Sequence, residues 1–165
     1  MQRRIIRSKP NGWEAVDAEG YEPNVPGNVS RHTLIGGRKD PGAPGPKLEL
    51  RYFEMQPGAV TRLEKHEHEH YVIIKTGLGY AIVGNTVTEV GPNDVVYVGP
   101  LEGHQFVNRG DEPFGIYCIV EAARDFSQQL SEEELAALRA SAAGAIARPD
   151  GAPRPRKERA TQQSA

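Results

Sequence analysis

The chain has 165 residues, of which 38% are hydrophobic and 25% charged, so it is long enough for one domain with extensions and too apolar to be disordered throughout. Its formal net charge of −2 gives no reason to expect binding to nucleic acid or to a membrane surface. The only cysteine, Cys118, excludes an internal disulfide and a cysteine-based zinc site, and its apolar neighbours predict an inert buried thiol.

Residues 1–46 are rich in glycine, proline and charge, which predicts an N-terminal arm that is mostly loop. Trp13, the only tryptophan, is the natural anchor of this arm, and residues 32–35 fit one short strand. Arg3 and Arg4 precede only two apolar residues, so they do not begin an export signal. No apolar run approaches the roughly 18 residues that span a bilayer. We therefore expect a cytoplasmic protein.

Residues 47–121 consist of short alternating or apolar segments separated by turns, which is typical of an all-β domain. The predicted strands cover residues 47–55, 70–75, 80–83, 86–90, 95–98, 104–108 and 114–120, with a further extended stretch over 59–66. Strands of this length and spacing form antiparallel sandwiches or barrels.

Residues 122–148 change to a helical period. Ser131 and Glu134 have the spacing of a capping box, in which each side chain bonds to the backbone of the other residue. An apolar helical stripe follows, and we expect it to pack on the outside of the β domain. Its members are Leu135, Leu138, Ala142, Ala145 and Ile146. Residues 149–165 are basic, proline-rich and without apolar anchors, which predicts a disordered tail.

Three of the five histidines, His66, His68 and His70, occupy alternate positions within five residues. Along a strand, side chains at positions i and i+2 project from one face about 7 Å apart, which suits two ligands of one metal ion. Positions i and i+4 are about 13 Å apart, so all three reach one ion only if the chain bends. A further ligand must come from elsewhere, and His104 is the remaining candidate. The alternative is a solvated loop without an ion.

At these positions the sequence resembles the small single-domain members of the cupin superfamily, whose first motif has the form G(X)5HXH(X)3,4E(X)6G. Gly77 sets the register of this motif. His70 then falls on the glutamate position, and the histidine pair falls on Glu64 and His66. Glutamate and histidine are thus exchanged, which keeps the common cupin set of three histidines and one carboxylate.

His104 and Asn108 match the H(X)3N end of the second cupin motif, G(X)5PXG(X)2H(X)3N. Asn93 and Gly99 replace a glycine and a proline in the preceding segment, which changes turn residues and not ligands. The resemblance covers about residues 48–121. It implies an all-β fold, an antiparallel double-stranded β-helix or jelly-roll barrel, followed here by a C-terminal α-helix.

The resemblance also implies one divalent transition metal (Fe, Mn, Ni, Cu or Zn) as the cofactor. The implied ligands are Glu64, His66, His70 and His104, with His68 as the alternative to Glu64. Motif register favours Glu64, and a carboxylate beside three neutral imidazoles balances a divalent cation better than a fourth imidazole does.

Glu64 and Arg62 are the predicted catalytic residues. A carboxylate that leaves the metal can serve as a general base, which gives Glu64 a second role. Arg62 shares the strand phase of Glu64, so it is a candidate for holding an anionic substrate inside the barrel. The alternative for Arg62 is a place on the rim or a pair with an acid such as Glu54.

Together these features indicate a metal-dependent cupin that acts on a small oxygenated organic molecule, with dioxygenase-type chemistry favoured. An isomerase or lyase, and a non-catalytic barrel that senses or stores a small ligand, are the alternatives. We expect a homodimer, because small cupins commonly pair through N-terminal strands and an exposed sheet edge needs cover. No nucleic-acid or membrane partner is expected.

Overall fold

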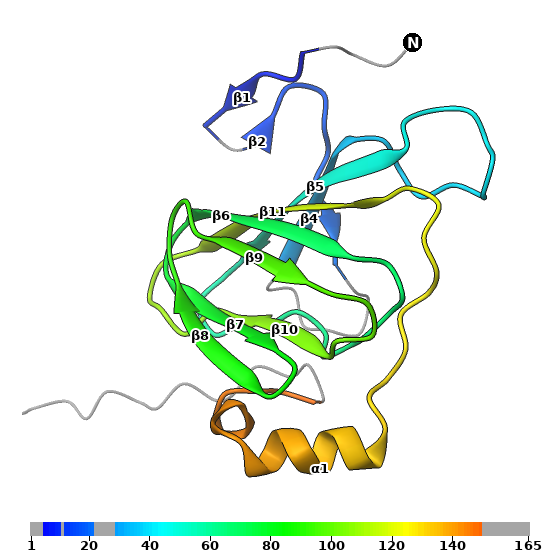
Figure 1. Ribbon diagram of the computed structural model, residues 1–165. Helices are drawn as coiled ribbons and strands as arrows, with labels where there is room; N and C mark the ends of the chain where they lie inside the picture. Colours follow the sequence, from blue (N-terminus) through cyan, green and yellow to red (C-terminus); the bar gives the residue numbers. More distant parts are fainter. Residues whose placement is uncertain (1–4, 11, 22–28, 150–165) are drawn as a thin grey trace, which may run out of the picture.

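The computed structural model describes residues 5–10, 12–21 and 29–149, and most of its elements are antiparallel strands (Figure 1). The strands are β1 (Ser8–Lys9), β2 (Gly12–Trp13), β3 (Glu19–Gly20), β4 (Val29–Ile35), β5 (Leu48–Met55), β6 (His70–Thr76), β7 (Gly79–Val83), β8 (Thr86–Val90), β9 (Val95–Val98), β10 (His104–Val107) and β11 (Phe114–Glu121). Helix α1 (Glu132–Ala140) and a 3-10 turn (Ala142–Ala145) follow. This order confirms the predicted all-β fold with a C-terminal helix.

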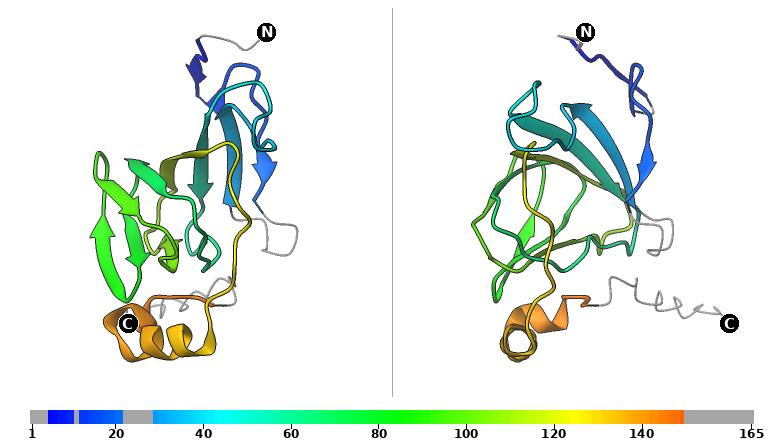
Figure 2. Two further views of the ribbon diagram at one scale, coloured as in Figure 1. Left: turned by 45° about the vertical axis from the view of Figure 1, so that its right-hand side comes forward. Right: turned by 90° about the vertical axis from the view of Figure 1, so that its right-hand side faces the viewer.

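Two sheets face each other and form the barrel (Figure 2). The larger sheet has the strand order β3-β4-β5-β11-β6-β9, and the smaller has the order β10-β7-β8. Apolar side chains from both sheets fill the space between them, and the largest fully buried ones are Phe114, Met55 and Ile74. Burial of such side chains is the main stabilising term of the barrel, at about 1.5–3 kcal/mol each.

The turn between β6 and β7 requires a glycine. Gly77 has a φ angle of 74°, which side chains with a Cβ rarely adopt. A Cβ atom at this position would lie 2.4 Å from the carbonyl oxygen of Pro113, far inside van der Waals contact. The glycine that sets the motif register is therefore demanded by the backbone itself.

The N-terminal arm contributes a full strand to the barrel. β4 begins at Val29 rather than at residue 32 and pairs with β5 along most of its length. The side chain of Trp13 is 5% exposed and packs edge-on against Tyr52 on the outer face of the larger sheet, with ring centroids 4.7 Å apart. The predicted anchor role of Trp13 is confirmed.

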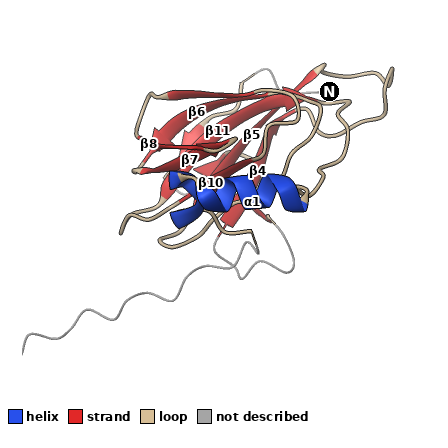
Figure 3. Ribbon diagram, turned by 60° about the horizontal axis from the view of Figure 1, so that its bottom comes forward, coloured by secondary structure: helices blue, strands red, loops and turns tan. Residues whose placement is uncertain are grey.

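Helix α1 packs on the outer face of the smaller sheet, as predicted (Figures 1 and 3). The capping box is present, because Ser131 accepts a bond from the Glu134 backbone and Glu134 accepts one from the Ser131 backbone. Leu138 is 1% exposed and lies in a cluster with Ile82 and Val107. The helix ends at Ala140, so the predicted apolar stripe is divided between α1 and the 3-10 turn.

Residues 150–165, which make up nearly all of the predicted disordered tail, lie outside the described residues. Within the described part of the chain, α1 is too short and too polar to cross a bilayer, and no other helix there could do so.

Candidate metal centre

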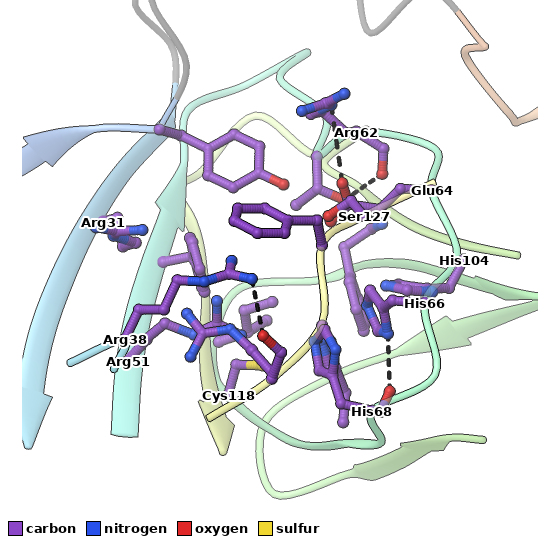
Figure 4. A pocket seen from close by; sticks show the side chains of 18 of the residues that line it. Arg31, Arg38, Arg51, Arg62, Glu64, His66, His68, His104, Cys118 and Ser127 are labelled. Carbon is purple, nitrogen blue, oxygen red and sulfur yellow. Dashed lines mark hydrogen bonds and ion pairs between the residues drawn. The ribbon is translucent and has the colours of Figure 1, made fainter. Parts of the chain in front are cut away.

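A pocket of about 310 Å³ opens between the two sheets and reaches the closely spaced histidines His66, His68 and His70 (Figure 4). Its wall is formed by β4, β5, β6, β10 and β11, by the segment before β6, and by the segment after β11. The wall carries four histidines, five arginines, the single cysteine and several aromatic rings. A metal-binding end and a basic end are therefore present in one cavity.

His66, His70 and His104 come together in this pocket, with one ring nitrogen from each lying within 4.8 Å of the others. All three are buried, with exposed fractions of 1%, 8% and 3%. His70 and His104 are the first residues of β6 and β10. The chain bends at residues 67 and 68, which is the bend that the spacing of the histidines required.

Backbone pairing places His66, which lies outside the strands, beside His104 and His70. The amide of Glu64 donates to the carbonyl of His104 at 3.2 Å, and the amide of His104 donates to the carbonyl of Glu64 at 2.9 Å. The segment before β6 therefore runs alongside β10, and His66 follows within two residues of this contact.

Main-chain carbonyl groups orient two of the imidazole rings. His66 donates from Nδ1 to the carbonyl of His68 at 2.7 Å, and His104 donates from Nδ1 to the carbonyl of Glu102 at 2.9 Å. Because each Nδ1 carries the proton, each Nε2 presents a lone pair. The Nε2 atom of His66 is buried and has no hydrogen-bond partner. Such an orphaned nitrogen fits a metal ligand whose orientation is fixed from behind.

The histidines are held neutral. Burial lowers the pKa of His66 and lowers that of His104 to about 4. Burial and repulsion from His104 and Arg51 depress the pKa of His70 further. Neutral imidazoles are the ligand form of histidine, so the cluster is ready for a cation at neutral pH.

His68 also faces the pocket, held by an acid from the segment after β11. Its Nδ1 lies 2.6 Å from Oδ1 of Asp125, and the Asp125 carboxylate also accepts bonds from the amides of Glu67 and His68. These bonds help to lower the pKa of Asp125 to about 2, and burial lowers the pKa of His68 to about 4. The Nε2 atom of His68 lies 3.2 Å from that of His70.

Glu64 lines the same pocket but points to an arginine. Its Oε2 lies 3.8 Å from Nε of Arg62, and its side chain is 14% exposed. Among the described residues, the clustered ligand atoms come from the three histidines and include neither Glu64 nor His68. The fourth ligand therefore stays a prediction, with Glu64 first and His68 as the alternative. Arg62 reaches the wall from a position where its side chain is 43% exposed.

The structure adds four pocket arginines that the sequence analysis did not single out: Arg31, Arg38, Arg51 and Arg124. Arg51 is 8% exposed and lies on β5 between the buried residues Glu49 and Phe53 of the same face. The signal in the sequence was the alternation of residues 48–55, which places Glu49 and Arg51 together on one face. Two charges on the face of β5 that also carries Phe53 and Met55 are compatible with a polar site inside a barrel, although the alternation does not say which face lies inside.

Cys118 lies in the pocket wall opposite Arg51 on the neighbouring strand. Burial raises the pKa of the Cys118 thiol, and Arg51 opposes this rise by donating from its guanidinium to Sγ at 3.2 Å. The predicted burial is confirmed, since Cys118 is 2% exposed. Its place in the pocket could not be predicted from an apolar run alone.

The donor set fits one divalent transition metal. Three neutral imidazoles with convergent nitrogens, one of them orphaned, form half of an octahedral shell or most of a tetrahedral one. His66, His70 and His104 would hold the ion, and a carboxylate or water would complete its shell.

Comparisons with known proteins show the family of the chain. Residues 51–120 match the Cupin_2 family model, described as a cupin domain. Over 131 residues, the chain is 42% identical to the 1-methylthio-D-xylulose 5-phosphate methylsulfurylase of Rhodospirillum rubrum, covering 78% of this chain and 80% of the relative.

Solved structures show the same fold. A cupin-2 domain protein from Rhodospirillum rubrum has a TM-score of 0.71 and 39% identity, covering 88% of this chain and 94% of that chain. A cupin 2 conserved barrel domain protein from Rhodopseudomonas palustris has a TM-score of 0.69 and 35% identity, covering 83% and 93%.

Proposed function

Because the chain belongs to the cupin superfamily, we propose that it is a metal-dependent enzyme acting on a phosphorylated sugar that carries a methylthio group. The observation that carries this proposal is the composition of the pocket, where a histidine cluster for a metal shares one cavity with five arginines. A sugar phosphate has oxygen atoms for the first and a dianion for the second. The identity to the methylsulfurylase, extending over 80% of that protein, supports the methylthio group as the part that reacts.

The residues of this chain divide the chemistry between them. A divalent ion, when bound, would act as a Lewis acid on a carbonyl or hydroxyl oxygen of the sugar. The guanidinium groups bind the phosphate and orient the sugar. Glu64, which lines the pocket beside the histidines, is assigned the proton transfer at the carbon next to the carbonyl.

Removal of a methylthio group from a carbon next to a ketone needs a thiol acceptor. The thiolate attacks the sulfur, so that an S–S bond forms and the C–S bond breaks. The electron pair of the broken bond stays on carbon, and a proton completes the deoxy sugar. The acceptor is a small-molecule thiol supplied with the substrate, because Cys118, the only thiol of the chain, is 2% exposed and its Sγ accepts a hydrogen bond from Arg51 at the basic end of the pocket. Burial also raises the pKa of the Cys118 thiol, which disfavours its thiolate form.

Dioxygenase-type cleavage is the second candidate. It is favoured by Glu64, whose place beside the three histidines would complete a ligand set that leaves two octahedral positions open. A lyase or isomerase would use the same ligands without consuming oxygen.

Turnover of 1-methylthio-D-xylulose 5-phosphate by the Mn(II)- or Fe(II)-loaded protein, with dithiothreitol present, tests the proposal. We expect the substrate to disappear in phosphorus NMR spectra, the methylthio group to appear on a thiol, and dissolved oxygen to stay constant. Omitting dithiothreitol should abolish turnover with unchanged metal content. Full metal occupancy with no loss of substrate would overturn the proposal, and oxygen uptake would favour the second candidate.

We also propose a homodimer formed through the outer face of the larger sheet. Apolar side chains are exposed there, among them Ile35 at 40%, Ile73 at 38% and Tyr97 at 50%. An apolar groove on this face is lined by Ile6, Trp13, Leu34, Ile35, Leu50, Ile73, Tyr117 and Ile119. Contiguous apolar surface of this kind is typical of an interface. Light scattering should give twice the chain mass, and Ile73→Glu should give the monomer.

A further inference from the structure

The charge of the pocket differs from that of the whole chain. Five arginines line it, against two carboxylates, those of Glu64 and Asp125. The chain as a whole has a formal net charge of −2, so positive charge is concentrated at this site. A pocket with such an excess raises the local concentration of anions.

Three of the five arginines have a carboxylate partner. Arg31 binds Glu19, with 2.6 Å between nitrogen and oxygen, and Arg62 lies 3.8 Å from Glu64. Arg124 forms an ion pair with Glu49, in which both side chains are less than 9% exposed. Each of these guanidinium groups therefore has a carboxylate of the protein within ion-pair distance.

Arg51 is different because it is buried and forms no ion pair of its own; Glu49 on the same face of β5 attracts its charge but is paired with Arg124. The NH2 group of Arg51 donates to Sγ of Cys118, and its Nε is buried with no hydrogen-bond partner. Within the described part of the chain, no carboxylate lies at ion-pair distance from it. Its charge reaches the metal centre, since it helps to lower the pKa of His70 and His104. Two buried arginines, Arg51 and Arg124, thus share one buried carboxylate, and a bound anion would balance the remaining positive charge.

Arg38 is the second guanidinium group with neutral partners. It donates to the carbonyl oxygens of Arg124 and Asp125 at 2.8 and 2.7 Å, and its Cζ lies 3.8 Å from the centre of the Phe126 ring. None of these groups carries a formal charge at the contact. The bonds fix the planar guanidinium group, and the remaining N–H donors face a pocket that Arg51 also lines.

We infer that Arg38 and Arg51 form the subsite for the phosphate group of the substrate, an inference that rests on the proposed function. Two guanidinium groups offer the paired N–H donors that phosphate oxygens accept. Figure 4 shows Arg38 and Arg51 on the opposite side of the pocket from His66 and His104. A sugar phosphate held at this subsite therefore directs its other end, with the carbonyl and hydroxyl oxygens, toward the histidines.

The subsite is also linked to the metal end through the backbone. The segment whose carbonyls hold Arg38 includes Asp125, and the carboxylate of Asp125 holds His68 and the amide of Glu67. Asp125 therefore contacts both ends of the pocket: its carbonyl holds Arg38, and its carboxylate holds the segment with Glu67 and His68. This makes Arg38 a positioning residue for the substrate as well as a charge.

Calorimetric binding of D-xylulose 5-phosphate and of unphosphorylated D-xylulose to the metal-loaded protein tests the subsite. We expect the phosphorylated sugar to bind at least about 10-fold more tightly. Arg38→Gln and Arg51→Met should each remove about 10-fold of this preference, and Arg51→Lys should restore part of it. Arg139→Gln, an exposed arginine of α1, is the matched control and should have no effect. The thermal transition of each variant verifies folding. Because Arg38 is exposed, Arg38→Gln tests the subsite without disturbing the core.

Equal binding of the two sugars, or a preference that survives in both variants and is lost in Arg31→Gln or Arg62→Gln, would overturn the subsite. Arginine-dependent binding without turnover of the methylthio substrate would overturn the proposed reaction and leave the subsite standing. Turnover with binding that ignores Arg38 and Arg51 would do the reverse.

Discussion

The two ends of the pocket are built by opposite means. At the histidine end the imidazoles are neutral, and His66 and His104 each donate a hydrogen bond to a main-chain carbonyl, which fixes the ring before any ligand arrives. At the basic end Arg38 and Arg51 are charged, and among the described residues no carboxylate lies at ion-pair distance from either. The first end is preorganised for a cation, whereas the second gains its counter-charge only with an anion.

The largest expected effect comes from removing a histidine ligand. His104→Ala should lower metal affinity by on the order of 100-fold or more, because an imidazole supplies a bond that water replaces poorly. Metal content of the purified protein, by elemental analysis, measures this. His32→Ala is the control, since His32 is equally buried but packs against Trp13 on the outer face, away from the pocket. One ion per chain in His104→Ala would show that His104 is not a metal ligand, and the histidine end would not be a metal site of the proposed kind.

The histidine end could be predicted from the sequence because two of its three clustered ligands, His66 and His70, are close in the sequence and the third, His104, matches the second cupin motif. Three ligand candidates lie within five residues, and the turn at Gly77 fixes the register between the motif and β6. The bend at residues 67 and 68 followed from the strand rise alone. The barrel could also be predicted from the sequence, because most strands show an alternating or apolar pattern that ends at a turn.

The basic end could not be predicted in the same way. Alternation along β5 separates Glu49 and Arg51 from Leu48 and Leu50, but it does not say which face lies inside. The outer face is also covered, by Trp13 of the arm, so both faces carry apolar residues. Arg38 lies in a loop without periodicity, and only the tertiary path of the segment after β11 brings it to the pocket.

A second test asks whether Glu64 or His68 is the fourth metal ligand. We expect Glu64→Gln to weaken metal binding by about 10- to 100-fold, since Glu64 is the one anionic member of the predicted ligand set, and His68→Gln to weaken it by less than about 10-fold. Competition with a chromogenic chelator gives both affinities. The glutamine side chains preserve volume in each case. If the metal survives Glu64→Gln and is lost in His68→Gln, the fourth ligand is the imidazole that Asp125 holds.

The two ends should also respond differently to acid. In metal-free protein the pKa of His104 is about 4, below the unfolded value of 6.5, so the unfolded chain takes up a proton that the folded chain refuses. Stability therefore falls as the pH drops from about 6.5 to about 4, by up to on the order of 3 kcal/mol for this group. Urea unfolding with a chelator present, from pH 7.5 to 4.5, measures the change.

His104→Gln should flatten this dependence, because the group that titrates is gone. The arginines contribute nothing in the same interval, since they stay charged throughout. An unchanged pH dependence in the variant would mean that another buried group, such as His70, controls the acid response.

The smallest expected effect is a difference in salt dependence between sugar-phosphate binding at the basic end and metal binding at the histidine end. Screening shortens from about 10 Å at 0.1 M to about 3 Å at 1 M salt, which acts on exposed charges such as Arg38 and little on buried ones. We expect binding of D-xylulose 5-phosphate to weaken several-fold over this range and metal affinity to change less than about twofold. Unphosphorylated D-xylulose is the control for general salt effects. If salt weakened the binding of the metal and of the sugar phosphate equally, both affinities would depend on the same charges. The division of the pocket into a neutral end and a charged end would then be wrong.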